Sequence, residues 1–365
     1  MFQERGEKRG FSPPLLTDTL SGQERGLGGE ASFYFQSDKK CTFPLTASII
    51  DPVNPKLIPT PTSLVRSQTL STTLLLDSLI RSLQSGSLYA LMAIGLTLTL
   101  TVIKLPNFAH AELITVGAYA ALLVSIGISS NPIVVLGLAF VVAALVALLC
   151  HRLVYRPLAA QKPSTYTMIL ASFATGLILR YIIFLLANRF DLFDKRINVP
   201  QVIWFQNSAV TLTNIFFWVV PTSIGLVIIL SLVLTYTGLG RDMRALADNL
   251  NLARIIGIPV QRVHDLTWLL VGGFAGVAGA LWGMYTVVDP LVGWLAILSV
   301  FAATVLGGMT SFIGTILGAY IVGFAENVIM QLLNAYTGLD FSFKPAVPFV
   351  IIILVLLIRP QGLKK

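Results

Sequence analysis

Charge, cysteine and histidine are all scarce in this chain. Only 12% of its 365 residues are charged, whereas about a quarter are charged in an ordinary soluble domain. The two cysteines, Cys41 and Cys150, form no C-x-x-C pair, so the sequence implies neither a disulfide framework nor a metal site. Histidine occurs only at positions 110, 151 and 264, which excludes a histidine-rich metal site. We therefore expect no cofactor and no metal centre.

Several motifs of catalytic proteins are also missing. The sequence has no G-x-x-x-x-G-K-[ST], so it does not bind ATP through a P-loop. It has neither H-E-x-x-H nor G-x-S-x-G, which leaves an intramembrane hydrolase without support. The sequence thus predicts a protein that is not an enzyme.

Long apolar runs dominate what is present. Hydrophobic residues make up 55% of the chain, and its mean hydropathy is +0.80. The predicted fold is an all-α, polytopic integral membrane helix bundle of about 8–10 transmembrane helices, each of roughly 20 residues. The segment 291–309 is also compatible with a re-entrant helix. The predicted spans lie near residues 77–103, 108–127, 131–150, 166–188, 214–237, 264–288, 291–309, 312–334 and 343–358.

The net charge of +8 does not indicate nucleic-acid binding, because the basic residues lie in short loops between apolar spans. Residues 151–162, 238–262 and 359–365 together hold ten Lys and Arg, whereas 189–213 and 335–344 hold four. The positive-inside rule therefore predicts that segment 238–262 and the C-terminus are cytoplasmic. With nine spans, the N-terminus would lie outside.

Two regions of different composition are predicted: a polar N-terminal extension, 1–72, and a transmembrane domain, 73–365. The extension carries eight Lys or Arg and seven Asp or Glu, lacks a signal-peptide pattern and has no apolar run long enough for a core. We expect it to be disordered, with targeting or partner binding as the alternative. A further hypothesis is that native translation begins near Val65 or Leu70.

One compact charged stretch, residues 240–263, interrupts the apolar chain with four arginines and two aspartates. Its apolar residues recur at the i, i+3, i+4, i+7 spacing of an amphipathic helix, at Met243, Leu246, Ala247 and Leu250. A solvated loop that only sets topology would explain the arginines but not this pattern. We therefore predict a rigid unit that docks into a groove on another protein.

A second short helix is predicted over Asn249–Ile256. Asp248 is its predicted N-cap, because an aspartate oxygen accepts the free N–H groups of a first helical turn. Gly257 fits the position after the helix, where a left-handed conformation costs little, and Pro259 prevents continuation.

Five stretches, in their order and spacing, resemble one membrane-protein family. They are NFAHAELITVGAY (107–119), RLVYRPL (152–158), GRDMRALADN (240–249), VLGGMTSFIGTILG (305–318) and RPQGL (359–363). Together they are similar to LivH-type permeases of branched-chain amino-acid ABC importers. Residues 1–72 have no counterpart in that family. Two positions depart from its pattern: Ala111 and Thr310 stand where the family usually has glycine, which puts close helix approach there in doubt.

The resemblance implies a permease subunit that translocates branched-chain amino acids or related small polar solutes across the plasma membrane. Its implied partners are a second homologous permease subunit, two ATP-binding cassette subunits that hydrolyse ATP, an extracytoplasmic solute-binding protein and the lipid bilayer. Segment 238–262 would be the cytoplasmic coupling segment. The residues assigned to ATPase coupling are Arg241, Arg244, Ala245, Ala247, Asp248, Arg254, Gly257 and Pro259.

Ionisable groups inside predicted spans are costly and usually face a cavity or a partner. One interpretation is that Asn107, His110 and Glu112 line the translocation path or its cytoplasmic gate. Alternatively, Glu112 bonds a neighbouring helix terminus and fixes the turn between the first two spans, or a proton relay operates. Arg180 is expected to snorkel toward the outer end of its span, and Glu326 to pair with a base or face a wet interior.

Small residues recur at G-x-x-x-G spacing, which lets helix backbones approach closely in lipid. We expect these glycines to serve helix packing within one subunit, with a subunit interface as the alternative. They are Gly272, Gly276, Gly279, Gly283, Gly314 and Gly318.

Two further function classes stay open at this point. An ion-coupled secondary transporter would use Glu112 and Glu326 as proton or sodium sites, and its uptake would collapse with a protonophore. A structural or receptor membrane protein would carry no flux at all.

Overall fold

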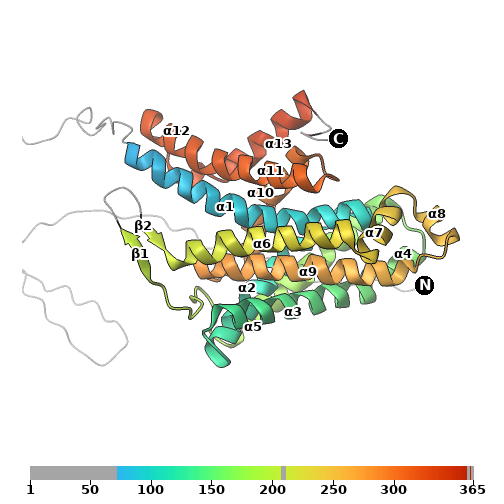
Figure 1. The fold of residues 1–365 in the computed structure, drawn as a ribbon. Coiled ribbons are helices and arrows are strands. Elements are labelled where there is room, and N and C mark those ends of the chain that lie inside the picture. Colours follow the sequence, from blue (N-terminus) through green and yellow to red (C-terminus); the bar gives the residue numbers. More distant parts are fainter. Residues whose placement is uncertain (1–71, 207–210, 360–361, 363–365) are drawn as a thin grey trace, which may run out of the picture. The chain divides into compact units, whose positions relative to one another are not determined.

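The computed structural model describes residues 72–206, 211–359 and 362. The predicted disorder of the extension and the two alternative translation starts lie outside these residues. The described chain is a bundle of long helices (Figure 1). Its α-helices are α1 (Thr72–Leu98), α2 (His110–Gly127), α3 (Pro132–Cys150), α4 (Arg156–Ala160), α5 (Thr165–Arg189), α6 (Asn214–Tyr236), α7 (Gly238–Asp248), α8 (Leu250–Ile255), α9 (Val260–Tyr285), α10 (Val292–Gly307), α11 (Phe312–Phe324), α12 (Met330–Thr337) and α13 (Ala346–Ile358).

Short irregular helical turns join some of these helices. π-Helical turns at Thr99–Ile103, His151–Tyr155 and Ala325–Ile329 extend α1, α3 and α11, and a 3₁₀ turn at Phe341–Phe343 precedes α13. Among the described residues, seven helices are long and apolar enough to cross a membrane, and α10 and α13 are shorter apolar helices. All nine lie where the sequence predicts spans, which confirms the polytopic helical membrane fold.

A small β-hairpin is the part of the fold that the sequence analysis misses. Strands β1 (Ile203–Gln206) and β2 (Thr211–Thr213) pair antiparallel between α5 and α6. Each strand is too short for a two-residue alternation of apolar and polar side chains to be recognised.

Helix α9 occupies the centre of the bundle and packs against α2 and α3, while α1 packs against α10 and α11. Five of the six predicted packing glycines lie at these helix contacts. A Cβ atom added at Gly272 would lie 2.5 Å from the Ala143 carbonyl oxygen of α3, and one at Gly279 would overlap the Ile114 carbonyl of α2. The backbones therefore approach too closely for any side chain there.

Gly276, Gly314 and Gly318 make similar backbone contacts, whereas Gly283 faces the side chains of Val288 and Ile197 in connecting segments. A Cβ atom at Gly276 would lie 2.5 Å from the Ala139 carbonyl oxygen of α3, and one at Gly283 would lie 2.8 Å from Val288. Gly314 and Gly318 of α11 face the backbone of α10 at Gly307 and Ala303.

The two departures from the family pattern have different surroundings. Ala111 is buried, and α10 approaches its backbone through Gly293, where an added Cβ would overlap the Ala111 carbonyl. The backbones of α2 and α10 therefore still approach closely at Ala111, because the facing residue on α10 is a glycine. Thr310 is exposed in the turn between α10 and α11, where no helix approach is needed.

Helix α10 starts inside the bundle rather than at its edge. It spans 16 residues, or about 24 Å, which is less than the roughly 30 Å of a bilayer core. The Gly293 N–H donates a hydrogen bond to Thr115 Oγ1 at 3.1 Å, so the first turn of α10 lies beside the first turns of α2.

Candidate functional site

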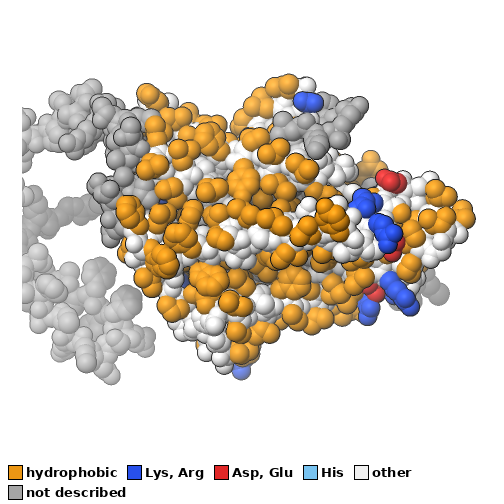
Figure 2. Space-filling model, in the orientation of Figure 1, with side chains coloured by type: hydrophobic (Ala, Val, Ile, Leu, Met, Phe, Trp, Pro, Cys, Tyr) orange, Lys and Arg blue, Asp and Glu red, His pale blue; other side chains and the backbone are white. Residues whose placement is uncertain are grey.

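Helices α7 and α8 form the predicted charged unit at one end of the bundle, beside α4 and the start of α9 (Figure 1). Figure 2 shows an apolar face on which the visible charged side chains gather mainly at this end. The Thr237 hydroxyl caps α7 by accepting from the Gly240 N–H at 3.2 Å. Met243 and Leu246 are buried against the bundle, whereas Arg241 and Arg244 are exposed. The apolar residues of α7 therefore face the bundle and Arg241 faces outward, while the exposed Arg244 also donates a hydrogen bond to the Leu234 carbonyl of α6.

The N-cap of α8 is one residue later than predicted. Asn249, not Asp248, caps this helix: its side-chain oxygen accepts from the N–H groups of Asn251 and Leu252 at 3.0 and 3.1 Å. The reason is backbone conformation, because Asp248 is still the last residue of α7, whereas Asn249 is extended with φ −151° and ψ 103°. Asp248 itself is exposed.

The end of α8 follows the predicted stop signals. Gly257 adopts φ +87°, a left-handed conformation that side chains rarely tolerate. Pro259 then precedes α9, which begins at Val260. Arg254, Gly257 and Pro259 are exposed, and Ala245 and Ala247 are partly buried.

Exposed apolar side chains on α8 are a feature that the sequence analysis did not single out. Leu252, Ile255 and Ile256 are 55%, 81% and 65% exposed, and they flank Arg254. Contiguous exposed apolar groups with a charged rim mark interaction surfaces. The run LNLARII carries the signal, because buried Ala253 leaves its larger apolar neighbours on the outer face.

The start of α9 is tied to the neighbouring π-helical turn and to α4 by polar contacts. Asp265 accepts a hydrogen bond from Arg152 at 2.7 Å, and Gln261 accepts one from Arg156 at 2.5 Å. Deeper in, the buried ring of Trp268 stacks on Tyr155, with ring centroids 4.8 Å apart. The base of α9 is thus held to α3 and α4 directly below segment 238–262.

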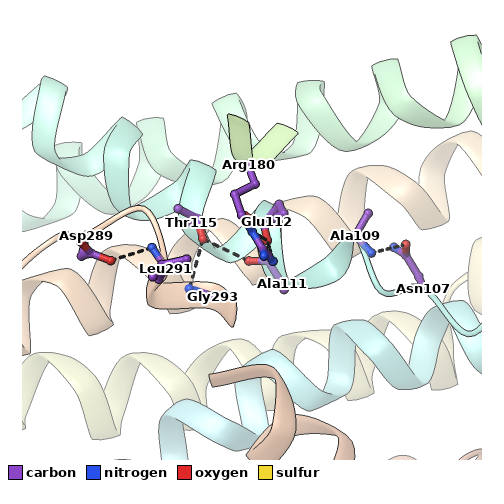
Figure 3. Close-up of polar contacts among 9 residues, drawn as sticks. All are labelled: Asn107, Ala109, Ala111, Glu112, Thr115, Arg180, Asp289, Leu291 and Gly293. Carbon is purple, nitrogen blue, oxygen red and sulfur yellow. Dashed lines mark hydrogen bonds and ion pairs between the residues drawn. The ribbon is translucent and has the colours of Figure 1, made fainter. Parts of the chain in front are cut away.

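Tyr155 connects this stack to the start of α2. Its hydroxyl donates to Asn107 Oδ1 at 3.2 Å, and the same oxygen accepts from the Ala109 N–H at 3.2 Å. Asn107 thereby holds the turn that leads into α2 (Figure 3). His110, the first residue of α2, forms a hydrogen bond with the Met92 carbonyl through Nε2 at 2.9 Å. The structure therefore encloses Asn107 and His110 within the bundle, and both are fully buried.

Glu112 is paired with Arg180 of α5 (Figure 3). Glu112 Oε1 accepts from Arg180 Nε at 2.9 Å and from Nη2 at 2.5 Å. The guanidinium also lies over the Trp294 ring of α10, 4.2 Å from its centroid. Arg180 therefore does not snorkel to the membrane edge, and Glu112 bonds a side chain rather than a helix terminus. These partners are 68 residues apart in the chain, so no local sequence signal identifies the pair.

Glu326 has neutral partners within the described chain. Tyr89 and Ser299 donate hydrogen bonds to its two carboxylate oxygens at 2.7 and 2.5 Å. The carboxylate is buried and satisfied by hydroxyl groups, which differs from the basic partner or wet interior expected from the sequence. In residues 72–206 and 211–359, no three His, Cys, Asp or Glu side chains gather as a metal site.

The bundle of long apolar helices, with charged side chains gathered at one end, defines a multi-pass membrane protein as the class. The family model described as "Branched-chain amino acid transport system / permease component" matches residues 78–357. The chain therefore belongs to this permease family.

Individual relatives agree with this assignment. The chain is 33% identical over 283 residues to a probable branched-chain amino acid transport permease protein, LivH, of Methanocaldococcus jannaschii, covering 76% of this chain and 89% of that protein. It is 32% identical over 303 residues to LivH, a high-affinity branched-chain amino acid transport system permease protein of Escherichia coli, covering 79% and 94%. It is 29% identical over 301 residues to BraD of Pseudomonas aeruginosa, covering 79% and 95%.

These findings confirm the LivH-type resemblance. They support an ABC-importer permease over the ion-coupled secondary transporter. Membership of this family indicates that the chain works with ATPase and binding-protein components.

Proposed function

We propose that this chain imports branched-chain amino acids or related small polar solutes as one of two homologous permease subunits. Two ATP-binding cassette subunits would dock on its cytoplasmic side and hydrolyse ATP, and a solute-binding protein would deliver cargo from outside. The chain itself would carry no catalytic activity. The cargo is supported by the printed names of the three relatives described above, which are branched-chain amino acid transport permeases.

Segment 238–262 is the coupling segment in this proposal. The observation that carries it is the outer face of α8, where Leu252, Ile255 and Ile256 are exposed beside Arg254. A face of this kind fits a groove on a partner, with apolar anchors and a charged rim. Exposed Arg241 and Arg244 on α7 would extend the contact.

The orientation follows from the distribution of basic residues. Arg152, Arg156, Arg254 and Arg262 belong to the end that carries α7 and α8, and loops rich in Lys and Arg stay in the cytoplasm. The coupling segment and the C-terminus would therefore face the cell interior, in a multi-pass protein of the plasma membrane.

The path or gate would lie at the start of α2, at Asn107, His110 and Glu112. Movement of the coupling segment reaches this point through rigid contacts, because α8 leads through Pro259 directly into α9. Trp268 of α9 stacks on Tyr155, and Tyr155 bonds Asn107. The Trp268–Tyr155–Asn107 relay would transmit closure of the ATPase subunits to the gate.

The proposal is tested with the complete importer in proteoliposomes. Ile255→Asp places a charge on an 81% exposed side chain of the docking face, and Ile128→Asp makes the same change on a 69% exposed residue at the opposite end of the bundle. We expect Ile255→Asp to abolish ATP-driven uptake and binding of the ATPase subunits, and Ile128→Asp to keep both. Normal uptake by Ile255→Asp, or uptake that collapses with a protonophore, would contradict the proposal.

A further inference from the structure

The Glu112–Arg180 ion pair lies deep in the bundle rather than near either end. His110, in the same helical turn as Glu112, bonds the Met92 carbonyl of α1. Met92 precedes the end of that span at Ile103 by about 16 Å at about 1.5 Å per residue, which is roughly half of a 30 Å bilayer core. The pair is therefore placed where a solute crossing the membrane must pass a low-dielectric barrier.

Three helices bring complementary groups together here. Glu112 comes from the first turn of α2, Arg180 from the outer half of α5, and Trp294 from the first turn of α10. The Glu112 side chain is 1% exposed and Arg180 is 13% exposed. The Trp294 ring that covers the guanidinium is 40% exposed, so the pair lies one aromatic ring below the surface of the chain.

The carboxylate is only half satisfied by the described residues. Arg180 Nε and Nη2 both donate to Oε1, whereas Glu112 Oε2 is buried and has no hydrogen-bond partner among the described residues. A buried carboxylate oxygen without a donor is costly, more so than a neutral group. This free oxygen is a second, independent sign that a donor belongs at the site.

We propose that Glu112 and Arg180 are the intramembrane recognition site for the zwitterionic head of an α-amino acid. The inference rests on the proposed function and assigns its substrate class to specific residues. The Glu112 carboxylate receives the substrate ammonium group, Arg180 binds the substrate carboxylate, and Trp294 covers the site. Arg180 and Glu112 separate and each exchanges its partner for the opposite charge of the substrate.

Charge balance explains why this site selects a zwitterion. A net-neutral zwitterion adds one positive and one negative charge, so every buried charge keeps a partner when the ion pair opens. A solute with only one of these charges leaves either Glu112 or Arg180 unpaired, and an unpaired buried charge is strongly unfavourable. An uncharged solute offers no replacement for either partner.

The test measures ligand selectivity of the purified importer complex in lipid nanodiscs, without the solute-binding protein. The probes are L-leucine, 4-methyl-2-oxopentanoate, which lacks the ammonium group, and leucine methyl ester, which lacks the carboxylate. Saturation-transfer NMR detects such weak binding, with and without a non-hydrolysable nucleotide. We expect leucine to bind at least about tenfold more tightly than either analogue, the effect of one charge-assisted hydrogen bond.

Glu112→Gln keeps the volume and an oxygen acceptor for Arg180 but removes the negative charge. We expect leucine binding to weaken by about tenfold and the preference over the oxo acid to disappear, whereas Glu112→Asp keeps the preference. The control Asp191→Asn makes the same chemical change in the exposed Asp191–Lys195 pair and should alter nothing. A purely structural clamp between α2 and α5 would not change this selectivity.

Two results would overturn the inference. One is a wild-type complex that binds the three probes alike, a result that does not depend on any variant folding. The other is an assembled Glu112→Gln complex that keeps the wild-type preference. Failure of the proposed function is distinguishable, because wild-type proteoliposomes with all partners would then accumulate no leucine on addition of ATP.

Discussion

Tyr155→Phe tests whether movement of the coupling segment reaches the start of α2 through a side-chain relay. The substitution keeps the ring that stacks on Trp268 at 4.8 Å and removes only the hydroxyl that bonds Asn107 Oδ1. Asn107 Oδ1 still accepts from the Ala109 N–H at 3.2 Å, so the oxygen keeps one partner. The change therefore removes one buried hydrogen bond without leaving an unsatisfied acceptor.

The expected effect of Tyr155→Phe on uptake follows from the free energy of that single hydrogen bond. A buried hydrogen bond contributes about 1 kcal/mol, and a bias of that size shifts a two-state equilibrium about fivefold. If the bond transmits closure to the gate, the number of leucine molecules imported per ATP hydrolysed should fall, by up to about fivefold. The ATPase rate itself should stay near the wild-type rate, because the docking face is untouched.

The assay measures ATP hydrolysis and leucine uptake in the same proteoliposomes, and differential scanning fluorimetry reports stability. Tyr166→Phe is the matched control, because this tyrosine is 83% exposed and does not belong to the relay. An unchanged uptake-to-ATP ratio in Tyr155→Phe, with only a lowered melting temperature, would refute the relay and leave Tyr155 a packing residue.

Three further predictions concern packing, capping and the ion-coupled alternative. Gly279→Val should overlap the α2 backbone and lower the yield of folded protein, whereas Gly137→Val, which meets nothing within 4 Å, should be tolerated in the same fluorimetric assay. Asn249→Ala should destabilise α8 by about 1 kcal/mol and speed hydrogen exchange there, whereas Asp248→Ala should not, and equal effects would contradict the capping assignment. Glu326→Gln should keep wild-type uptake and pH dependence, because one of the hydroxyls of Tyr89 and Ser299 can donate to the amide oxygen and the other can accept from the amide NH2 group. Loss of uptake would instead favour a protonatable transport site.

The positions of the membrane-spanning helices could be predicted because each one is a long apolar run. Residues 214–237 predict a span, and the helix observed there is Asn214–Tyr236. The end of α8 could also be predicted from the sequence, since Gly257 adopts the left-handed conformation that its place before Pro259 indicates. Such local signals depend on residues within one or two turns of each other.

Contacts between distant helices could not be predicted in this way. The pairing of Glu112 with Arg180 depends on how α2 and α5 pack, and neither segment encodes the other's position. The cap of α8 was misassigned by one residue because Asp248 and Asn249 are both good capping residues. Only the backbone, helical at Asp248 and extended at Asn249, distinguishes them.

The central claim is that an ATP-binding cassette subunit binds the coupling segment, residues 238–262. The most direct measurement is crosslinking of Ile255→Cys, in a background with Cys41 and Cys150 replaced by serine, followed by mass spectrometry of the crosslinked peptides. The account predicts capture of a subunit that contains a G-x-x-x-x-G-K-[ST] motif, and no capture from Ile128→Cys. An assembled, transporting complex in which Ile255→Cys never crosslinks to such a subunit would contradict it.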